Sequence, residues 1–146
     1  MAATNIDAVL GALVELAEDA TGLQVLDGPV LDGLMWEHVV IGFPDGEDSS
    51  YTVERSPMPG LRTAMREDWS VRCLLSLTTG ASTVADVRAR AVEALTALED
   101  SVAAASTTSE LWSRARVEGR LDWYVLQHED GVSVNVLFSV SGTCLP

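Results

Sequence analysis

Lysine is absent from this 146-residue sequence, and its nine basic residues are all arginine. Against them stand 22 acidic residues, so the formal net charge is -13. A chain this acidic is repelled by nucleic-acid phosphates, because electrostatic DNA binding depends on cationic side chains that displace counterions. The charge therefore argues against a protein that grips a duplex, and the missing lysine excludes a GxxxxGK phosphate loop.

Cysteine and histidine are also scarce, with two of each. Cys73 and Cys144 lie far apart without CxxC spacing, so we expect two reduced, buried thiols. His38 and His128 belong to no HExxH or similar cluster, and a structural role is the favoured interpretation for both. The sequence therefore predicts no catalytic residues, no metal site and no cofactor, and it indicates a protein that is not an enzyme.

Long hydrophobic runs are missing too. No stretch approaches the roughly 18 residues that a membrane span needs, and the N-terminus lacks the basic region of a signal peptide. With 47% hydrophobic residues, the chain is long enough for one core and short for two. We therefore expect a single soluble domain over residues 1–146 with no membrane contact.

Two segments have the apolar periodicity of helices. The first begins at Ile6 behind the possible caps Thr4 and Asn5 and ends at Gly22. The second begins behind Ser82 or Thr83 and ends in the run Ala103 to Ser109. Its predicted apolar stripe consists of Val84, Val87, Ala91, Val92, Leu95, Leu98 and Val102.

Strand patterns fill most of the remaining chain, and the clearest is the alternation from Glu67 to Leu77 around Trp69. Glu129-Asp130-Gly131 marks a hairpin turn between two later strands. Weaker strand patterns cover Leu23–Leu26, Met35–Phe43, Tyr51–Glu54, Leu111–Val117, Leu121–Gln127 and Val132–Val140. We expect an α+β fold in which a mixed, mainly antiparallel sheet of about four to five strands carries two helices on one face.

The segment at about 44–66 is expected to be a mobile loop. It opens with the acidic cluster Asp45, Glu47 and Asp48, which lacks the glycine and final glutamate of an EF-hand loop. Its later part, Ser56–Leu61, holds two prolines and a glycine, and we expect no regular structure there.

Tryptophan and arginine supply the remaining candidates for an interface. The four tryptophans, Trp36, Trp69, Trp112 and Trp123, fall in strand-like segments, where indoles usually fill a core or a subunit contact. Arg114, Arg116 and Arg120 are expected to alternate along one strand, where they meet a neighbour's carboxylates or form a solvated face. The complete set of interface candidates is Asp45, Glu47, Asp48, Arg62, Arg66, Trp69, Trp112, Arg114, Arg116 and Arg120.

The order of elements resembles the tail terminator proteins of long-tailed phages. The segments that carry the resemblance are Glu67–Ser76, Asp86–Leu95 and Val132–Val140, together with Asp27-Gly28-Pro29 after the first helix. The resemblance spans nearly the whole chain and rests on patterning. It implies a virion protein at the head-tail junction that forms a hexameric ring, ends polymerisation of the tail tube protein and meets a head-tail connector protein. DNA would pass through the ring without specific binding, and an acidic channel suits that passage.

Two alternatives from other classes remain open. One is a different connector, neck or minor capsid-associated protein, although such proteins tend toward helical bundles or small barrels. The other is a small α/β enzyme or ligand-binding domain whose pocket forms around His38, His128 and Asp122, since a fold alone does not exclude a function.

Overall fold

The computed structural model describes residues 3–29, 37–44, 46, 48–60, 64–79, 83–129 and 131–146. These residues form two helices and a seven-stranded sheet. In chain order the elements are α1 (Ile6–Thr21), β1 (Gln24–Asp27), β2 (His38–Ile41), β3 (Tyr51–Pro57), β4 (Met65–Thr79), α2 (Val84–Thr108), β5 (Ser113–Val117), β6 (Asp122–His128) and β7 (Gly131–Cys144).

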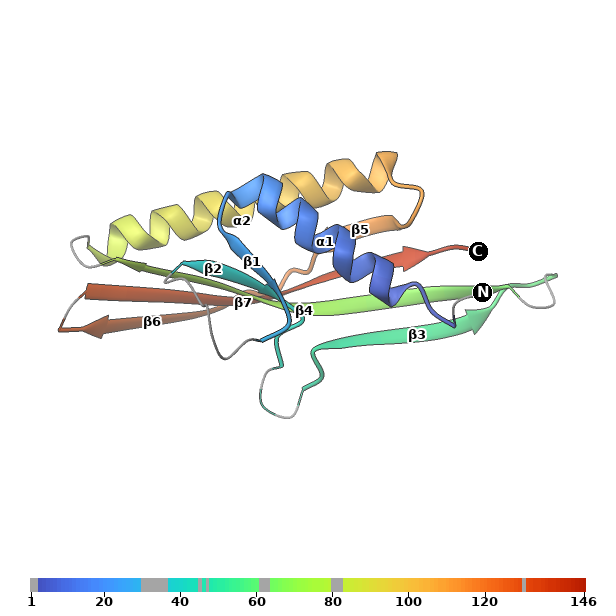
Figure 1. The fold of residues 1–146 in the computed structure, drawn as a ribbon, viewed down its shortest axis with the longest axis horizontal. Helices are drawn as coiled ribbons and strands as arrows, with labels where there is room; N and C mark the ends of the chain where they lie inside the picture. The colour runs from blue at the N-terminus through green and yellow to red at the C-terminus, as the bar shows by residue number, and fades with distance from the viewer. Residues whose placement is uncertain are drawn as a thin grey trace.

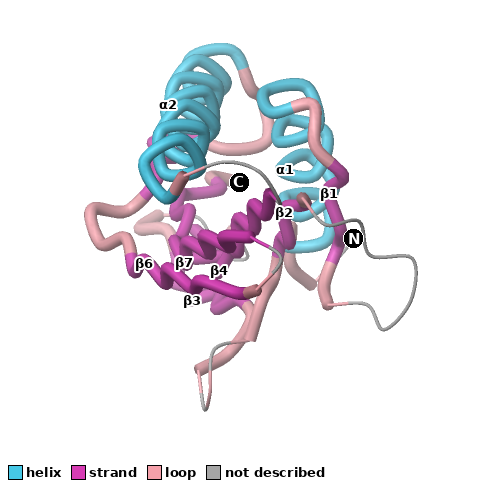
Figure 2. The backbone as a smooth tube through the Cα atoms, turned by 90° about the vertical axis from the view of Figure 1, so that its left-hand side faces the viewer, coloured by secondary structure: helices cyan, strands magenta, loops and turns pink. Residues whose placement is uncertain are grey.

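The sheet is mainly antiparallel, as predicted, and only β1 and β2 pair in parallel. Its main path runs β1-β2-β4-β7-β5, while β3 also pairs with β4 and β6 with β7. Both helices cover one face of the sheet (Figures 1 and 2). The fold class is therefore confirmed, with more strands than the four to five expected, because the short β1 and β2 and the separate β5 and β6 all join the same sheet.

The core lies between the helices and the inner face of β4 and β7. Alternate β4 residues from Trp69 to Leu77 are buried, and the same alternation continues on β7 from Val132 to Val140. This is the period-two pattern of strands that bury one face. The α2 stripe is confirmed at Val87, Ala91, Leu95, Leu98 and Val102, whereas Val92 is half-exposed. Val92 misses the core because it follows Ala91 by one residue, about 100° around the helix.

Helix α1 begins in a way that the sequence did not predict. The Asn5 side chain does not cap the helix itself. Instead the buried carboxylate of Glu67 on β4 accepts hydrogen bonds from the Thr4 hydroxyl, the Asn5 backbone N–H at 2.9 Å and Asn5 Nδ2 at 2.8 Å. A negative charge at a helix N-terminus is favoured by the helix dipole. Glu67 therefore joins α1 to the sheet.

The other helix ends follow the predictions. Gly22 closes α1 in the left-handed conformation with φ of 68°, which glycine adopts without steric cost. Thr83 caps α2 in a reciprocal arrangement with Asp86. None of the helices in the described ranges has the length and apolarity needed to cross a membrane.

The β3–β4 hairpin corrects the prediction for Ser56–Leu61. Ser56 and Pro57 are not irregular, because they pair with Arg66 and Met65 in the β3–β4 ladder. Proline is tolerated there because β3 is an edge strand and Pro57 is its last residue. Leu61, at the end of the predicted irregular stretch, lies outside the described residues.

Beyond Glu67, which pairs with Cys144, the hairpin has no further β7 partner and projects from the body (Figure 1). We call its described residues 55–60 and 64–66 the arm, with Arg55, which pairs with Glu67, at its base. The arm is thus a two-stranded extension of the sheet rather than a loop lying on its surface.

Candidate assembly surface

Strand β6 presents an apolar edge to solvent. Tyr124, Val125 and Leu126 are 49%, 44% and 50% exposed, and Leu121 just before them is also exposed. Within the described sheet, β6 pairs with β7 alone, so the backbone groups of its other edge have no strand partner there. Soluble proteins usually protect such an edge with lysine, proline or a bulge, because it otherwise pairs with another chain. Strand β6 contains no lysine, proline or bulge, and its one acidic residue, Asp122, is paired with Arg120.

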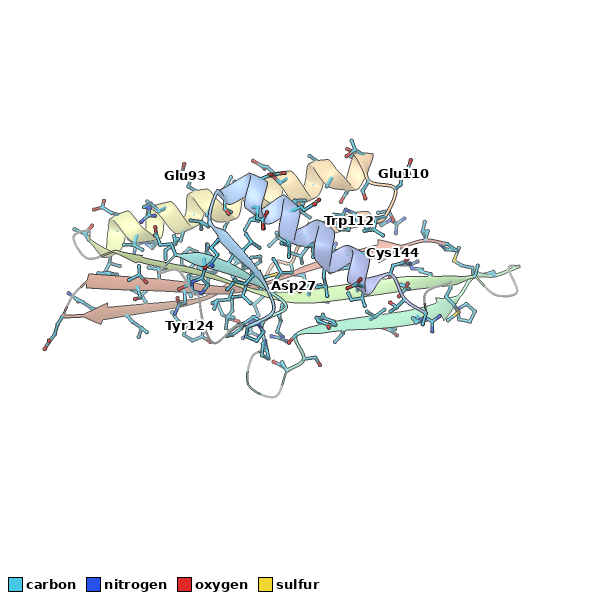
Figure 3. The ribbon with its side chains drawn as sticks, in the orientation of Figure 1. Asp27, Glu93, Glu110, Trp112, Tyr124 and Cys144 are labelled. Atoms are coloured by element: carbon cyan, nitrogen blue, oxygen red, sulfur yellow. The ribbon has the colours of Figure 1, made fainter. Side chains whose placement is uncertain are left out.

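The exposed side chains of β6 lie on both faces of the sheet. Tyr124 and Leu126 pair with Asn135 and Ser133 on the face away from the helices, and Figure 3 shows Tyr124 on that side. Val125 pairs with the buried Val134 and lies on the helix side. A partner strand added at this edge would therefore find apolar contacts above and below the sheet.

The outer face next to β6 is polar. Ser76 donates a hydrogen bond to Asn135 Oδ1 at 2.8 Å, and Thr78 donates to Ser133 Oγ at 3.3 Å, both between β4 and β7. These pairs satisfy polar groups that a dry interface would otherwise leave without partners. The outer face of β4 and β7 therefore suits contact with solvent or with a hydrated partner.

A charged cavity of about 200 Å³ lies on the same face. Arg72 forms an ion pair with Asp48 at 3.2 Å, and Arg120 forms one with Asp122 at 3.2 Å. The fifth charged group in the lining is Glu118, which accepts a hydrogen bond from Ser70 at 3.2 Å. Since the two arginines pair with carboxylates within the cavity, it is largely self-neutralised. The ion pair with Arg72 holds Asp48 against the sheet.

A second charged cluster lies at the base of the arm. The Asp68 carboxylate accepts hydrogen bonds from the Thr143 hydroxyl at 2.7 Å and from Arg66 at 3.0 Å. These bonds, with a smaller contribution from the positive charge of Arg114, hold the pKa of Asp68 below its usual range. Arg114 has φ of 57° beside a register shift between β5 and β7, and such bulges redirect side chains.

Trp69 and Trp112 occupy the core. They are 3% and 5% exposed, and their ring centroids lie 5.6 Å apart at an interplanar angle of 54°. Trp112 precedes β5 rather than lying within it. Trp123 is partly buried against the core, and Trp36 lies outside the described residues. The sequence left open whether Trp69 and Trp112 fill the core or a subunit contact. In the structure both side chains lie in the core.

The remaining interface candidates are dispersed. Asp45, Glu47 and Arg62 lie outside the described residues. Arg114 and Arg116 are on β5, whereas the expectation that Arg120 shares their strand is wrong. Strand β5 ends at Val117, and Arg120 lies between β5 and β6 with an 86% exposed side chain. Asp48 and Arg120 line the same cavity, and Arg66 and Arg114 both approach Asp68.

The residues of the enzyme alternative do not form a pocket together. His38 is on β2 and Asp122 is on β6, with β4 and β7 between them. At about 4.8 Å per strand, their strands are about 14 Å apart. The side chain of His128 lies outside the described residues. Among the described residues, no group of three histidine, cysteine or acidic side chains is arranged to hold a metal ion.

The cysteines are free and buried, as expected. Burial raises the pKa of the Cys73 thiol to about 12. Burial also raises the pKa of Cys144, the charge of Glu67 adds to that effect, and the Trp69 indole opposes it. Both thiols are therefore protonated at neutral pH and poorly nucleophilic.

The β6 edge was missed in the choice of interface candidates from the sequence. A signal was available, because Tyr124, Val125 and Leu126 form a continuous apolar run in a segment without lysine or proline. That run alone is equally typical of a strand buried on both faces. Only the sheet order shows that β6 is at an edge.

No protein-family model matches this sequence, and no curated protein matches it. Among solved structures, a chain of the "Virion of native gene transfer agent (GTA) particle" is similar, with a TM-score of 0.52 and 14% identity. The match covers 97% of this chain and 99% of that chain. The protein therefore shares its fold, over practically its full length, with a chain of a gene transfer agent virion.

Proposed function

We propose that this protein is a structural subunit of a phage-like virion. The observation that carries the proposal is the fold likeness to a gene transfer agent virion chain, which spans 97% of this chain and 99% of the other. Because the match covers nearly all of both chains, it relates whole domains rather than one shared motif. The role in assembly draws further support from the open β6 edge, since an unprotected apolar strand is typical of a surface that pairs with another chain.

Within that class, the proposed role is a tail terminator. Six copies close into a ring on the tail tube, stop its polymerisation and offer the head connector a surface. The two helices on a seven-stranded sheet favour this role over a connector built as a helical bundle or small barrel. The net charge of -13 suits a ring through which DNA slides without adhering.

The runner-up is another head-tail connector or neck subunit of the virion. The fold likeness supports it equally, because the name of the gene transfer agent virion covers all of its components. The two roles differ in the partner that is bound, the tail tube for a terminator and the head portal side for a neck protein.

Native mass spectrometry of the purified chain, together with binding assays on purified tail tubes and on purified heads, tests the proposal. A terminator is expected as a six-copy ring that caps one tube end and stops growth in a polymerisation assay. A ring that binds heads but never tubes would favour the neck role. A chain that stays monomeric with both partners would overturn the virion-subunit proposal.

A further inference from the structure

The groove between α1 and α2 has an apolar floor and an acidic rim. Its volume is about 480 Å³, and its floor includes Leu16, Ala105, Leu111 and the buried Trp112. Glu15 and Asp19, both exposed, line its α1 side, and no arginine is among the described residues that line it. A ligand that fits this groove should combine apolar side chains with positive charge.

The arm of the β3–β4 hairpin has the complementary chemistry. Its described residues carry Arg55 and Arg66 and no acidic residue, in a chain whose net charge is -13. They also include Pro57, Met58 and Met65. Methionine adapts its shape to an apolar surface because it is unbranched and polarisable. The arm is therefore a basic, apolar projection from an acidic body.

The arginines of the arm are available to a partner. Arg55 is exposed, and the Arg66 side chain is 41% exposed. Arg66 uses Nε and Nη2 on Asp68. A guanidinium has five N–H donors, so further donors remain for a second carboxylate.

The arm is directed away from the groove of its own chain. In Figure 1 the hairpin projects past the ends of both helices. The ladder with β7, from Thr79 to Glu67, fixes the base of the arm in the plane of the sheet. The arm therefore does not reach the α1–α2 groove of its own chain.

We infer that the arm of one copy docks in the α1–α2 groove of the next copy. Arg66 and Met58, on the hairpin face away from the helices, meet the Glu15 and Asp19 rim and the apolar floor. Arg55 and Met65, on the opposite face, add positive charge and apolar surface at the edge of the groove. Because arm and groove are different surfaces, the contact between successive copies is head-to-tail, and such a contact closes a ring when the rotation between copies closes. This inference rests on the proposed assembly function and names the surfaces that produce it.

A disulfide trap tests the contact directly. A chain with Met58→Cys is mixed with a chain with Ala104→Cys, whose side chain lines the groove and is exposed. Mild oxidation is expected to yield dimers with one of each chain. The matched control replaces Ala104→Cys with Val92→Cys, which is half-exposed on the same helix but does not line the groove, and should give no cross-link.

Charge reversal provides a second measurement. Arg55→Glu with Arg66→Glu, or Glu15→Arg with Asp19→Arg, should weaken association by about tenfold or more, because each places like charges in contact. The chain with all four changes should assemble again. Assembly at wild-type affinity in both double variants, without the cross-link, would overturn the arm contact and leave the ring proposal standing. Monomers under all conditions would overturn both.

Discussion

Trp69 on β4 and Gly142 on β7 are direct partners in the central ladder, and the indole lies over the glycine. A Cβ added at Gly142 would lie 2.5 Å from Cζ2 of Trp69 and 3.2 Å from the Ala115 backbone. The tryptophan pair of the core therefore depends on the absence of a side chain at one position of the neighbouring strand.

Gly142→Ala should lower the unfolding free energy by about 1–3 kcal/mol, because the added methyl overpacks the Trp69 site. The control is Gly119→Ala, where an added Cβ meets open space, and its effect should stay within about 0.5 kcal/mol. Urea unfolding followed by tryptophan fluorescence measures both. Equal stability of the two variants would contradict the packing described for Trp69.

Glu67→Gln should loosen the start of α1. The variant removes the negative charge and replaces one of the two acceptor oxygens with an NH2 group, and losing a hydrogen bond to a charged group costs about 1.5–3 kcal/mol. The effect should appear in hydrogen exchange as faster exchange in the first turn of α1, with little change in α2. Glu54→Gln, on the exposed side of β3, serves as the control and should leave that turn protected.

The Cys73 thiol should resist modification in the folded protein. At pH 8 a thiol reagent should label it only as fast as the chain unfolds, because burial holds its pKa at about 12. A Val92→Cys side chain, half-exposed on α2, should react at once. Rapid labelling of Cys73 in the native state would show that the β4 core opens readily.

The same burial predicts a loss of stability at alkaline pH. The folded pKa of Cys73 is raised, so its contribution to stability is complete below the usual thiol pKa of about 9. The contribution is lost as the pH rises toward the folded value of about 12. Unfolding free energies measured against pH should fall less steeply in this window for Cys73→Ala than for the wild type.

Thr143→Val should raise the pKa of Asp68 toward its ordinary value, since the Thr143 hydroxyl is the main cause of the lowering. A lowered carboxyl pKa stabilises the fold above the ordinary value of 3.8, and that contribution is lost as the pH falls through the folded pKa. The stability difference between the wild type and the variant should therefore shrink in acid. An NMR titration of the Asp68 carboxyl carbon checks the shift, and an unchanged value would remove Thr143 as its cause.

Leu126→Lys should block association through β6 without harming the monomer. A lysine on an edge strand opposes pairing with another strand, and the position is half-exposed, so the unfolding free energy should change by less than about 0.5 kcal/mol. Val92→Lys is the control, because Val92 has the same 50% exposure but lies on α2. Sedimentation velocity should show smaller assemblies for Leu126→Lys only.

The sequence predicted the elements better than their arrangement. Alternation around Trp69 and the helical stripe from Val87 to Val102 depend on local periodicity, and both are confirmed. Sheet order depends on contacts between distant residues, so periodicity did not show that β6 is an edge or that β1 and β2 extend the sheet. The prediction that Pro57 excludes regular structure was wrong, because the effect of a proline on a strand depends on whether that strand is at the edge of the sheet.

Among the candidate interface residues too, local patterns were predictable and contacts between distant residues were not. Asp48 and Arg120 are far apart in the sequence, and only the fold brings them to one cavity. Arg114 and Arg116 keep the predicted alternation around the buried Ala115, whereas Arg120 lies beyond the end of β5. Glu67 looked like the polar start of a strand, and its role at the start of α1 depends on a contact between residues 62 positions apart.

The length of strand β4 determines how the protein would respond to a pulling force on the arm. The strand runs without interruption from the arm to the far end of the sheet, paired with β7 from Glu67 to Thr79. Because the hydrogen bonds of an antiparallel ladder are perpendicular to the strands, tension along β4 loads them together in shear rather than one at a time. A force applied at the arm tip would thus be shared by all the hydrogen bonds of the β4–β7 ladder, and the subunit would transmit it with little deformation.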